Sequence, residues 1–216
     1  MNRSPTLSPT EPERKQVHRG RWKLLLVLLV CASPLIASYV TYYVIKPQTR
    51  TNYGVLIDPA AHPIPQLGTT TLDGRPAALA DFQGKWIMLK VGGSTCAAAC
   101  MEQMYAIRQL RSMQGKAMDR IERVWLITDQ EPLETILIRE LDGMEMLRAN
   151  PAAVAAWLPV APDAPLDGAI FLVDPRGHLM MRFPAVPATM PEADKLAHYA
   201  KVKKDLAKLL KASAIG

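Results

Sequence analysis

The sequence lacks the residue sets that mark several common enzyme classes. It has no Ser-His-Asp set, no glycine-rich phosphate loop and no pair of carboxylates placed for acid–base chemistry. Hydrolase and nucleotide-binding functions therefore have no support in the sequence. No internal repeat is present either, which excludes a repeat array. Histidine is scarce, with four in 216 residues, and none lies between Cys96 and Gly177.

A net positive charge is missing from the central part of the chain. The formal net charge is +6, but residues 1–23 carry +4 and residues 195–216 carry +5, so residues 24–194 carry −3. Nucleic-acid-binding domains present basic patches on their folded surface. The charge distribution therefore predicts that nucleic acid is not a partner.

One long run lacks any charged residue. It spans Leu24–Ile45, and its 22 residues are enough to cross a hydrocarbon core of about 30 Å as a helix. Lys and Arg are more numerous before the run than just after it, which predicts that residues 1–23 lie in the cytoplasm. Their polar composition predicts that they form a disordered tail. We expect the chain beyond the run to lie in the periplasm of a bacterial cell, tethered to the inner membrane.

A cleavable signal peptide is the alternative interpretation of this run. The run is long for such a peptide, and no A-x-A-like site follows it cleanly, so an uncut anchor is favoured. Cys31 lies inside the run after Leu-Leu-Val, a poor match to a lipidation sequence. We expect Cys31 to be a packing residue.

Strand-like and helix-like segments alternate after the anchor. A linker is expected at residues 46–68 and a folded domain at 69–216. Short apolar runs and turn residues predict a first strand with an Asp-Gly turn from Thr69, then strands at 85–93, 123–128, 169–173 and 179–183, the last two forming a hairpin. Helices are predicted at 97–113, 131–146, 151–157 and from 191 to near the C-terminus. This order indicates an α/β domain with a mixed central sheet.

The segment STCAAAC is the strongest candidate site. It places Cys96 and Cys100 where the first long strand gives way to a helix. Free backbone amides and the helix dipole favour a thiolate there, and Cys100 falls on the same helix face. In an oxidising compartment the pair can form a disulfide, provided that Cys96 leaves ideal helix geometry. The alternative is that both are buried as small apolar residues.

The order of elements, with a cysteine pair opening the helix after a long strand, resembles the thioredoxin fold. The stretch LDGRPAALADFQGKWIMLKVGGSTCAAAC is similar to the opening of peroxiredoxin-type and SCO/SenC-type thioredoxin domains, and FLVDPRG resembles their later hairpin. The Cys-x-x-x-Cys spacing and the anchor resemble the SCO/SenC family, which serves assembly of the copper centre of cytochrome c oxidase. The resemblance runs from Thr69 to about Leu210.

This resemblance implies that Cys96 and Cys100 are the reactive residues and the ligands of copper. Two thiolates on one face suit a soft ion such as Cu(I), whereas structural zinc takes four protein ligands. The implied partner is a respiratory oxidase subunit or another membrane protein.

The sequence departs from the family pattern at the third copper ligand. The family's histidine should lie near Leu166, where none occurs, and the prolines that follow the cysteines are replaced by Ala97 and Met101. His178, beside the hairpin turn, is the leading substitute. Weaker candidates are His62, His198, Met180 and Met181, while Met101, Met104 and Met113 are expected to fill the core.

Three functions stay open at this point. The first is an anchored accessory protein for oxidase assembly that handles Cu(I) or keeps a partner's thiols reduced. The second is a thiol:disulfide oxidoreductase in which Cys96 attacks and Cys100 resolves the mixed disulfide, with Pro165 as the nearest match to the proline that faces such a pair. The third is a non-enzymatic assembly module that no longer binds metal.

Overall fold

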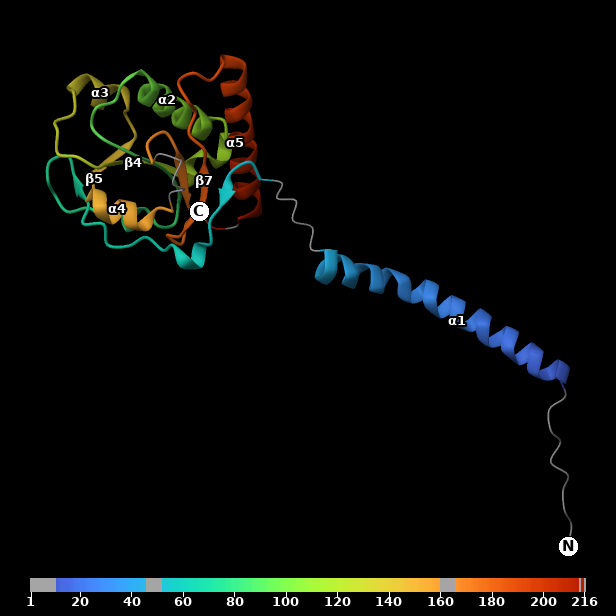
Figure 1. Cartoon of the computed structure of the whole chain (residues 1–216). Coiled ribbons are helices and arrows are strands. Elements are labelled where there is room, and N and C mark those ends of the chain that lie inside the picture. The colour runs from blue at the N-terminus through green and yellow to red at the C-terminus, as the bar shows by residue number, and fades with distance from the viewer. Residues whose placement is uncertain (1–10, 46–51, 160–165, 214, 216) are drawn as a thin grey trace, which may run out of the picture. The chain divides into compact units, whose positions relative to one another are not determined.

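The computed structural model describes residues 11–45, 52–159, 166–213 and 215, and it divides the chain into two units at Arg50/Thr51. The first unit is helix α1 (Glu11–Val40), which continues into the π-helical turn η1 (Thr41–Ile45) (Figure 1). Within it, Arg21–Val44 is long and apolar enough to cross a membrane, and none of that stretch is buried in protein.

The helix starts earlier than the predicted anchor. The expected disordered tail covers residues 1–23, but the structure is helical from Glu11. Arg, Lys, Gln and Glu are good helix formers, and an existing helix extends more easily than a new one begins, so the apolar run propagates helix toward its N-terminal flank. The first ten residues lie outside the described part of the chain.

The second unit is built on a seven-stranded sheet with the order β1-β7-β6-β3-β4-β5-β2. The central strand β3 (Trp86–Gly92) pairs in parallel with β4 (Ile121–Ile127) and antiparallel with β6 (Ile170–Val173). The hairpin partner of β6 is β7 (Leu179–Phe183), as predicted. The expected mixed sheet of a thioredoxin-like α/β fold is therefore confirmed.

Helices cover both faces of this sheet. Side chains of α2 (Ala98–Ser112), α3 (Thr135–Glu140) and α5 (Glu192–Ala212) join the core on one face. The opposite face packs against α4 (Pro151–Trp157). Short 3-10 helices are η2 (Pro59–Ala61), η3 (Leu79–Phe82) and η4 (Gly115–Arg120).

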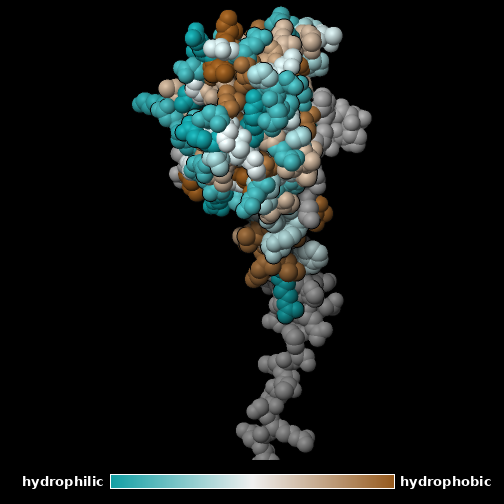
Figure 2. Space-filling view, turned by 90° about the vertical axis from the view of Figure 1, so that its left-hand side faces the viewer, coloured by the Kyte–Doolittle hydropathy of each residue, from teal (hydrophilic) through white to brown (hydrophobic). Residues whose placement is uncertain are grey.

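The surface that carries α3 and β5 (Glu145–Arg148) is mostly hydrophilic, with separate apolar spots, in Figure 2. By contrast, α1 exposes a continuous set of large apolar side chains. A set of that kind is expected of a helix that lies in lipid.

The helix predicted at 131–146 is wrong at both of its ends. Only Thr135–Glu140 is helical, and β5 follows, parallel to β4. Gly143 between them has φ +73, a left-handed conformation that stops a helix. The edge of β4 then offers hydrogen-bonding partners that outweigh the helix propensity of Glu and Met. The predicted short strand after Thr69 is present as β2 (Thr70–Thr71), antiparallel to β5.

The linker expected at 46–68 also needs correction. Its second part belongs to the folded unit, because β1 (Val55–Leu56) pairs antiparallel with β7 and Leu67 is buried. Pro63 forms a bridge to His178. A two-residue strand has too few residues to show an alternating pattern, so composition alone did not reveal it.

Candidate functional site

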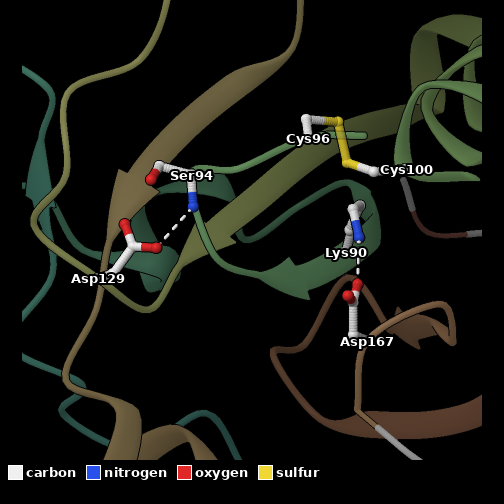
Figure 3. Close-up of a disulfide and its surroundings, with 6 residues drawn as sticks. All are labelled: Lys90, Ser94, Cys96, Cys100, Asp129 and Asp167. Atoms are coloured by element: carbon white, nitrogen blue, oxygen red, sulfur yellow. Dashed lines mark hydrogen bonds and ion pairs between the residues drawn. A yellow bond between two sulfur atoms is a disulfide. The ribbon is translucent and has the colours of Figure 1, made fainter. Parts of the chain in front are cut away.

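The loop that leads to the cysteines is held at the carboxyl end of β3. The backbone amide of Ser94 donates to Oδ2 of Asp129, which follows β4, at 2.8 Å (Figure 3). A Cβ atom on Gly93 would lie 2.6 Å from the same oxygen, so glycine is needed for this close approach. The carboxylate thus fixes the path of the chain two residues before Cys96.

The two cysteines predicted as the site are joined by a disulfide, with their Cα atoms 5.1 Å apart. Helix α2 starts at Ala98, and its N-cap residue Ala97 has extended backbone geometry. Cys96 therefore lies outside the helix, as the predicted disulfide required. No side chain caps the first turn and no acidic residue lies in it, so the amides there retain their preference for a thiolate.

The cysteines line two different clefts, each of about 480 Å³. Both side chains are half-buried, so they pack on the core and remain accessible. The cleft beside Cys100 is lined among others by Gln103, Asp167, Arg182, Pro187 and Tyr199. The cleft beside Cys96 includes Ser94, Met101, Glu131, Glu134 and Leu137. Met101, expected in the core, is therefore also part of a cleft wall.

Helix α5 contributes Tyr199 to the lining of the cleft beside Cys100. Lys195 bonds to Glu102 of α2 at 2.9 Å and to Glu192 at 3.0 Å, and these carboxylates raise the pKa of Lys195. Tyr199 faces the same cleft, and burial raises its pKa to about 12. Its hydroxyl therefore keeps its proton at neutral pH and can donate a hydrogen bond to a group in the cleft.

A buried lysine near the pair was not singled out from the sequence. Lys90 lies in β3 with a side chain 1% exposed, and its Nζ donates to Oδ1 of Asp167 at 2.8 Å (Figure 3). Gln103 of α2, also buried, donates to the carbonyl oxygens of Gly168 and Ala169. The available signal was a charged residue in the otherwise apolar run WIMLKV, since a central strand rarely buries an unpaired charge.

His178, the leading substitute ligand, is wrongly placed for that role. Strands β3 and β6 are antiparallel, with Ile87 opposite Val173 and Lys90 opposite Ile170. The turn after Val173 therefore lies near the start of β3, whereas the cysteines follow its end. His178 instead contacts Asp174, with Nδ1 3.5 Å from Oδ1.

The other candidate ligands are also engaged elsewhere. A ring nitrogen of His198 lies 2.7 Å from the hydroxyl of Tyr53, and Nδ1 of His62 lies 3.1 Å from the carbonyl oxygen of Asp58. Met181 is buried between the strands and α5, and Met180 packs against the same core. Pro165 lies outside the described residues.

The described residues contain no group of three or more His, Cys, Asp and Glu side chains arranged for a metal ion. The donor set that the structure does bring together is two sulfur atoms. Once reduced, such a pair suits Cu(I) carried as cargo, because this soft ion accepts low coordination.

Comparisons with known proteins agree with this architecture. A family model described as "Transmembrane-like, thioredoxin-like, C-terminal domain" matches residues 86–213. A second, described as "Transmembrane-like, N-terminal domain", matches residues 15–44. Together with the apolar stretch of α1, this match indicates a membrane anchor. No match was found among proteins with curated descriptions.

Two solved structures share the fold. The apo Sco1 protein from Thermus thermophilus is 19% identical in sequence to this chain, with a TM-score of 0.50. The match covers 76% of this chain and 98% of the Sco1 chain. A putative protein disulfide isomerase from Bacteroides thetaiotaomicron is also 19% identical, with a TM-score of 0.50. That match covers 74% of this chain and 95% of the isomerase chain. The resemblance to SCO/SenC-type thioredoxin domains is thereby confirmed at the level of the fold.

Proposed function

The chain belongs to the transmembrane-like, thioredoxin-like family, and from that premise we propose that it is an anchored thiol–disulfide protein that serves assembly of cytochrome c oxidase. One observation carries the proposal: Cys96 and Cys100 are paired at an uncapped helix start, and each lines an open cleft. A disulfide in that position is accessible to a partner's thiols, unlike a disulfide sealed in the core.

The proposed chemistry is the reduction of a partner's disulfide. The Cys96 thiolate attacks one sulfur of that disulfide, and the partner's other sulfur leaves as a thiolate that takes up a proton. The thiol of Cys100 then loses its proton and attacks Cys96, which releases the partner's second thiol. The partner gains two electrons, and Cys96 and Cys100 return to the disulfide. A dithiol reductant outside the membrane must then reduce the pair again.

Delivery of Cu(I) is the second candidate function. The resemblance of STCAAAC and its flanks to the SCO/SenC family supports it, as do the two sulfur donors that reduction would free. We propose that copper, if carried, is held by Cys96 and Cys100 and transferred to an oxidase subunit or another membrane protein.

We also propose that α1 holds the protein in the bacterial inner membrane with its N-terminus in the cytoplasm. The excess of Lys and Arg before the apolar stretch supports this orientation. The thiol site then faces the periplasm, where disulfides persist.

The test uses the full chain in detergent, in a Cys31→Ser background that removes the third thiol. We expect the pair to equilibrate with glutathione as one two-electron couple, to reduce insulin, and, once reduced, to bind one Cu(I). Each of the matched variants Cys96→Ser and Cys100→Ser should lose both the two-electron redox couple and the binding of Cu(I).

Two outcomes would contradict the proposal. A disulfide that dithiothreitol does not reduce in the folded chain removes the thiol cycle. Normal oxidase assembly in cells that carry both cysteine substitutions favours the non-enzymatic module instead.

A further inference from the structure

Helix α5 carries a concentration of positive charge that the proposed function has not used. Residues 199–212 contain five lysines and one acidic residue, Asp205. Asp205 is only 2% exposed, whereas all five lysines are exposed. Residues three and four positions apart lie on one side of a helix, so four of the lysines form a continuous exposed row. We call this row the lysine stripe, and it consists of Lys201, Lys204, Lys208 and Lys211.

The packing of α5 does not require the lysine stripe. The helix is held by another of its faces, on which Val202, Leu206 and Leu210 are buried in the core. Alanine and glutamine form helices about as well as lysine, and like charges four positions apart destabilise a helix. The helix dipole favours a lysine only in the last turn, where Lys211 lies. The stripe therefore indicates an anionic partner outside the chain.

The elements next to α5 do not cancel this charge. Helices α2 and η4 each contain two basic residues and one acidic residue. Glu102 of α2 bonds to Lys195, and Asp119 of η4 lies 3.5 Å from Arg111. The segment 52–57 contains no charged residue. The other acidic residues of α5 lie in its first turn, about two turns before the lysine stripe begins. Counted together, these elements carry a net positive charge.

The lysine stripe lies where the chain enters the folded unit. Oδ2 of Asp205, which adjoins Lys204 in the sequence, accepts hydrogen bonds from the backbone amides of Tyr53 and Gly54, at 2.6 and 2.9 Å. The Nζ atom of Lys201 lies 5.1 Å from the centre of the Tyr53 ring. Figure 1 shows β1, which follows these residues, beside α5. The start of the folded unit is therefore fastened to the helix that carries the stripe.

The length of chain before Tyr53 limits how far the lysine stripe can lie from lipid. The stretch long enough to cross a membrane ends at Val44, nine residues before Tyr53. Nine residues span at most about 32 Å, even when fully extended. A surface on so short a tether meets the membrane at high effective concentration. Anionic phospholipids attract lysines within roughly one Debye length, about 10 Å, so the tether brings the stripe within reach of them.

We propose that the lysine stripe binds the anionic headgroups of phospholipids in the membrane that α1 spans. An ammonium group is a compact charge with three donors, which suits phosphate oxygens at a hydrated surface. Tyr199, on the same helix, lines the cleft beside Cys100. Binding of the stripe therefore limits the directions in which that cleft can face a membrane partner. The inference rests on the proposed anchor and does not depend on the thiol cycle.

The test measures how close α5 lies to lipid when the full chain is inserted in nanodiscs. A fluorophore is attached through Ala207→Cys in a Cys31→Ser background, while Cys96 and Cys100 stay joined as the disulfide. Ala207 is exposed and lies three positions from Lys204. The discs contain phosphatidylcholine alone or mixed with phosphatidylglycerol. A nitroxide on the phosphatidylcholine headgroup quenches a fluorophore that lies near the bilayer surface.

We expect quenching to be about threefold greater in the discs that contain phosphatidylglycerol than in the neutral discs. High salt should remove this difference, because it screens interactions between exposed charges. Equal quenching in the two kinds of disc would overturn the proposal, and an acidic protein surface would be the remaining candidate partner of the stripe.

Two sets of substitutions separate the lysine stripe from the overall charge. Replacement of all four stripe lysines by glutamine should reduce quenching to the level of the neutral discs. The control replaces four exposed basic residues outside α5 by glutamine and should keep the wild-type difference; they are Arg75, Lys85, Arg139 and Arg176. An equal loss in the two variants would show that overall charge is responsible and would overturn the proposal.

A smaller variant keeps the test decisive if the quadruple stripe variant does not fold. Lys204→Gln with Lys211→Gln keeps the contact of Lys201 with Tyr53 and the ion pair of Lys208. It should lose about half of the difference in quenching. A difference of wild-type size in this variant would count against the proposal.

The lipid measurement is separate from the thiol function. Every variant keeps Cys96 and Cys100, so the reduction of insulin should not change. If lipid-dependent quenching occurs in a chain that reduces no insulin and binds no Cu(I), the proposed function fails while the lipid site stands. Thiol exchange without lipid-dependent quenching gives the reverse result.

Discussion

The hairpin turn and the cysteine end of the central sheet differ in how far their polar groups are satisfied by hydrogen bonds. At the hairpin end, Oδ1 of Asp174 accepts from the amides of Arg176 and His178, at 3.0 and 2.8 Å. The amide of Gly84 donates to the carbonyl oxygen of Pro175 in the same turn. At the cysteine end, Lys90 has one exposed carboxylate as its ion-pair partner, and Oε1 of Gln103 is buried with no hydrogen-bond partner among the described residues.

This difference indicates a division of work. Polar groups that are satisfied locally stabilise a turn and leave nothing for a ligand. Polar groups that are only partly satisfied reduce stability, and they commonly occur where chemistry takes place. The hairpin turn should therefore contribute mainly to stability, and the cysteine end mainly to reactivity.

The largest expected effect on stability comes from a substitution in the hairpin turn. Asp174→Ala leaves two turn amides without their acceptor and should lower the free energy of unfolding by about 3 kcal/mol. Urea titration followed by circular dichroism measures it, and alkylation of the reduced cysteines should not change. Asp73→Ala, in an exposed turn beside Thr71 and Arg75, is the control and should cost less. An equal loss of unfolding free energy in the two variants would show that Asp174 stabilises the fold no more than an exposed turn residue does.

A smaller effect is expected from opening the disulfide. Cys96 and Cys100 are only four positions apart, so the bond restricts the unfolded chain little, and its loss should cost about 2 kcal/mol. The paired Cys96→Ser and Cys100→Ser substitutions should leave the far-UV spectrum unchanged, because the cores on both sheet faces do not depend on the bond. Unfolding of the reduced chain at room temperature would show that the cysteine end belongs to the scaffold.

The smallest effect concerns pH and the helix that borders the cleft. Burial, assisted by the charge of Lys201, lowers the pKa of His198 below its ordinary 6.5. The unfolded chain then binds a proton more readily than the folded chain, so the contribution is complete above pH 6.5 and is lost as pH falls toward the lowered pKa. Between pH 7.5 and 5 the melting temperature should fall by a few degrees more in wild type than in His198→Gln.

The control for this measurement is His62→Gln, which should keep the wild-type pH dependence. His198 is packed against Tyr53 and Tyr199, so its surroundings are mainly aromatic. An identical pH dependence in all three proteins would show that His198 does not report on this wall of the cleft.

Local patterns were enough to predict the centre of the fold. The apolar runs around Trp86 and Ile170 predicted strands, and the Cys pair predicted a helix start, because each signal lies within a few neighbouring residues. The edge strand β1 and the inner strand β5 were not predicted, because β1 is stabilised by pairing with β7, far along the chain, and β5 by pairing with β4 and β2.

The residues of the candidate site also fall into those that the sequence indicated and those that only the structure revealed. Cys96 and Cys100 could be singled out as a candidate pair because they lie only four positions apart in the chain. His178 was assigned wrongly, and Lys90 was overlooked, because strand register decides which end of β3 each residue lies at. Register depends on long-range pairing and side-chain packing, which no short stretch of sequence contains.

The amino-acid sequence alone thus determined the apolar anchor, the α/β class and the cysteine pair, since hydrophobic period, charge and spacing act over a few residues. Only the tertiary structure decided that the second part of the expected linker joins the sheet, that the hairpin histidine lies at the opposite end of β3 from the cysteines, and that a lysine is buried in β3. Those outcomes depend on which segments, distant in sequence, bury their apolar surface together in one folded core.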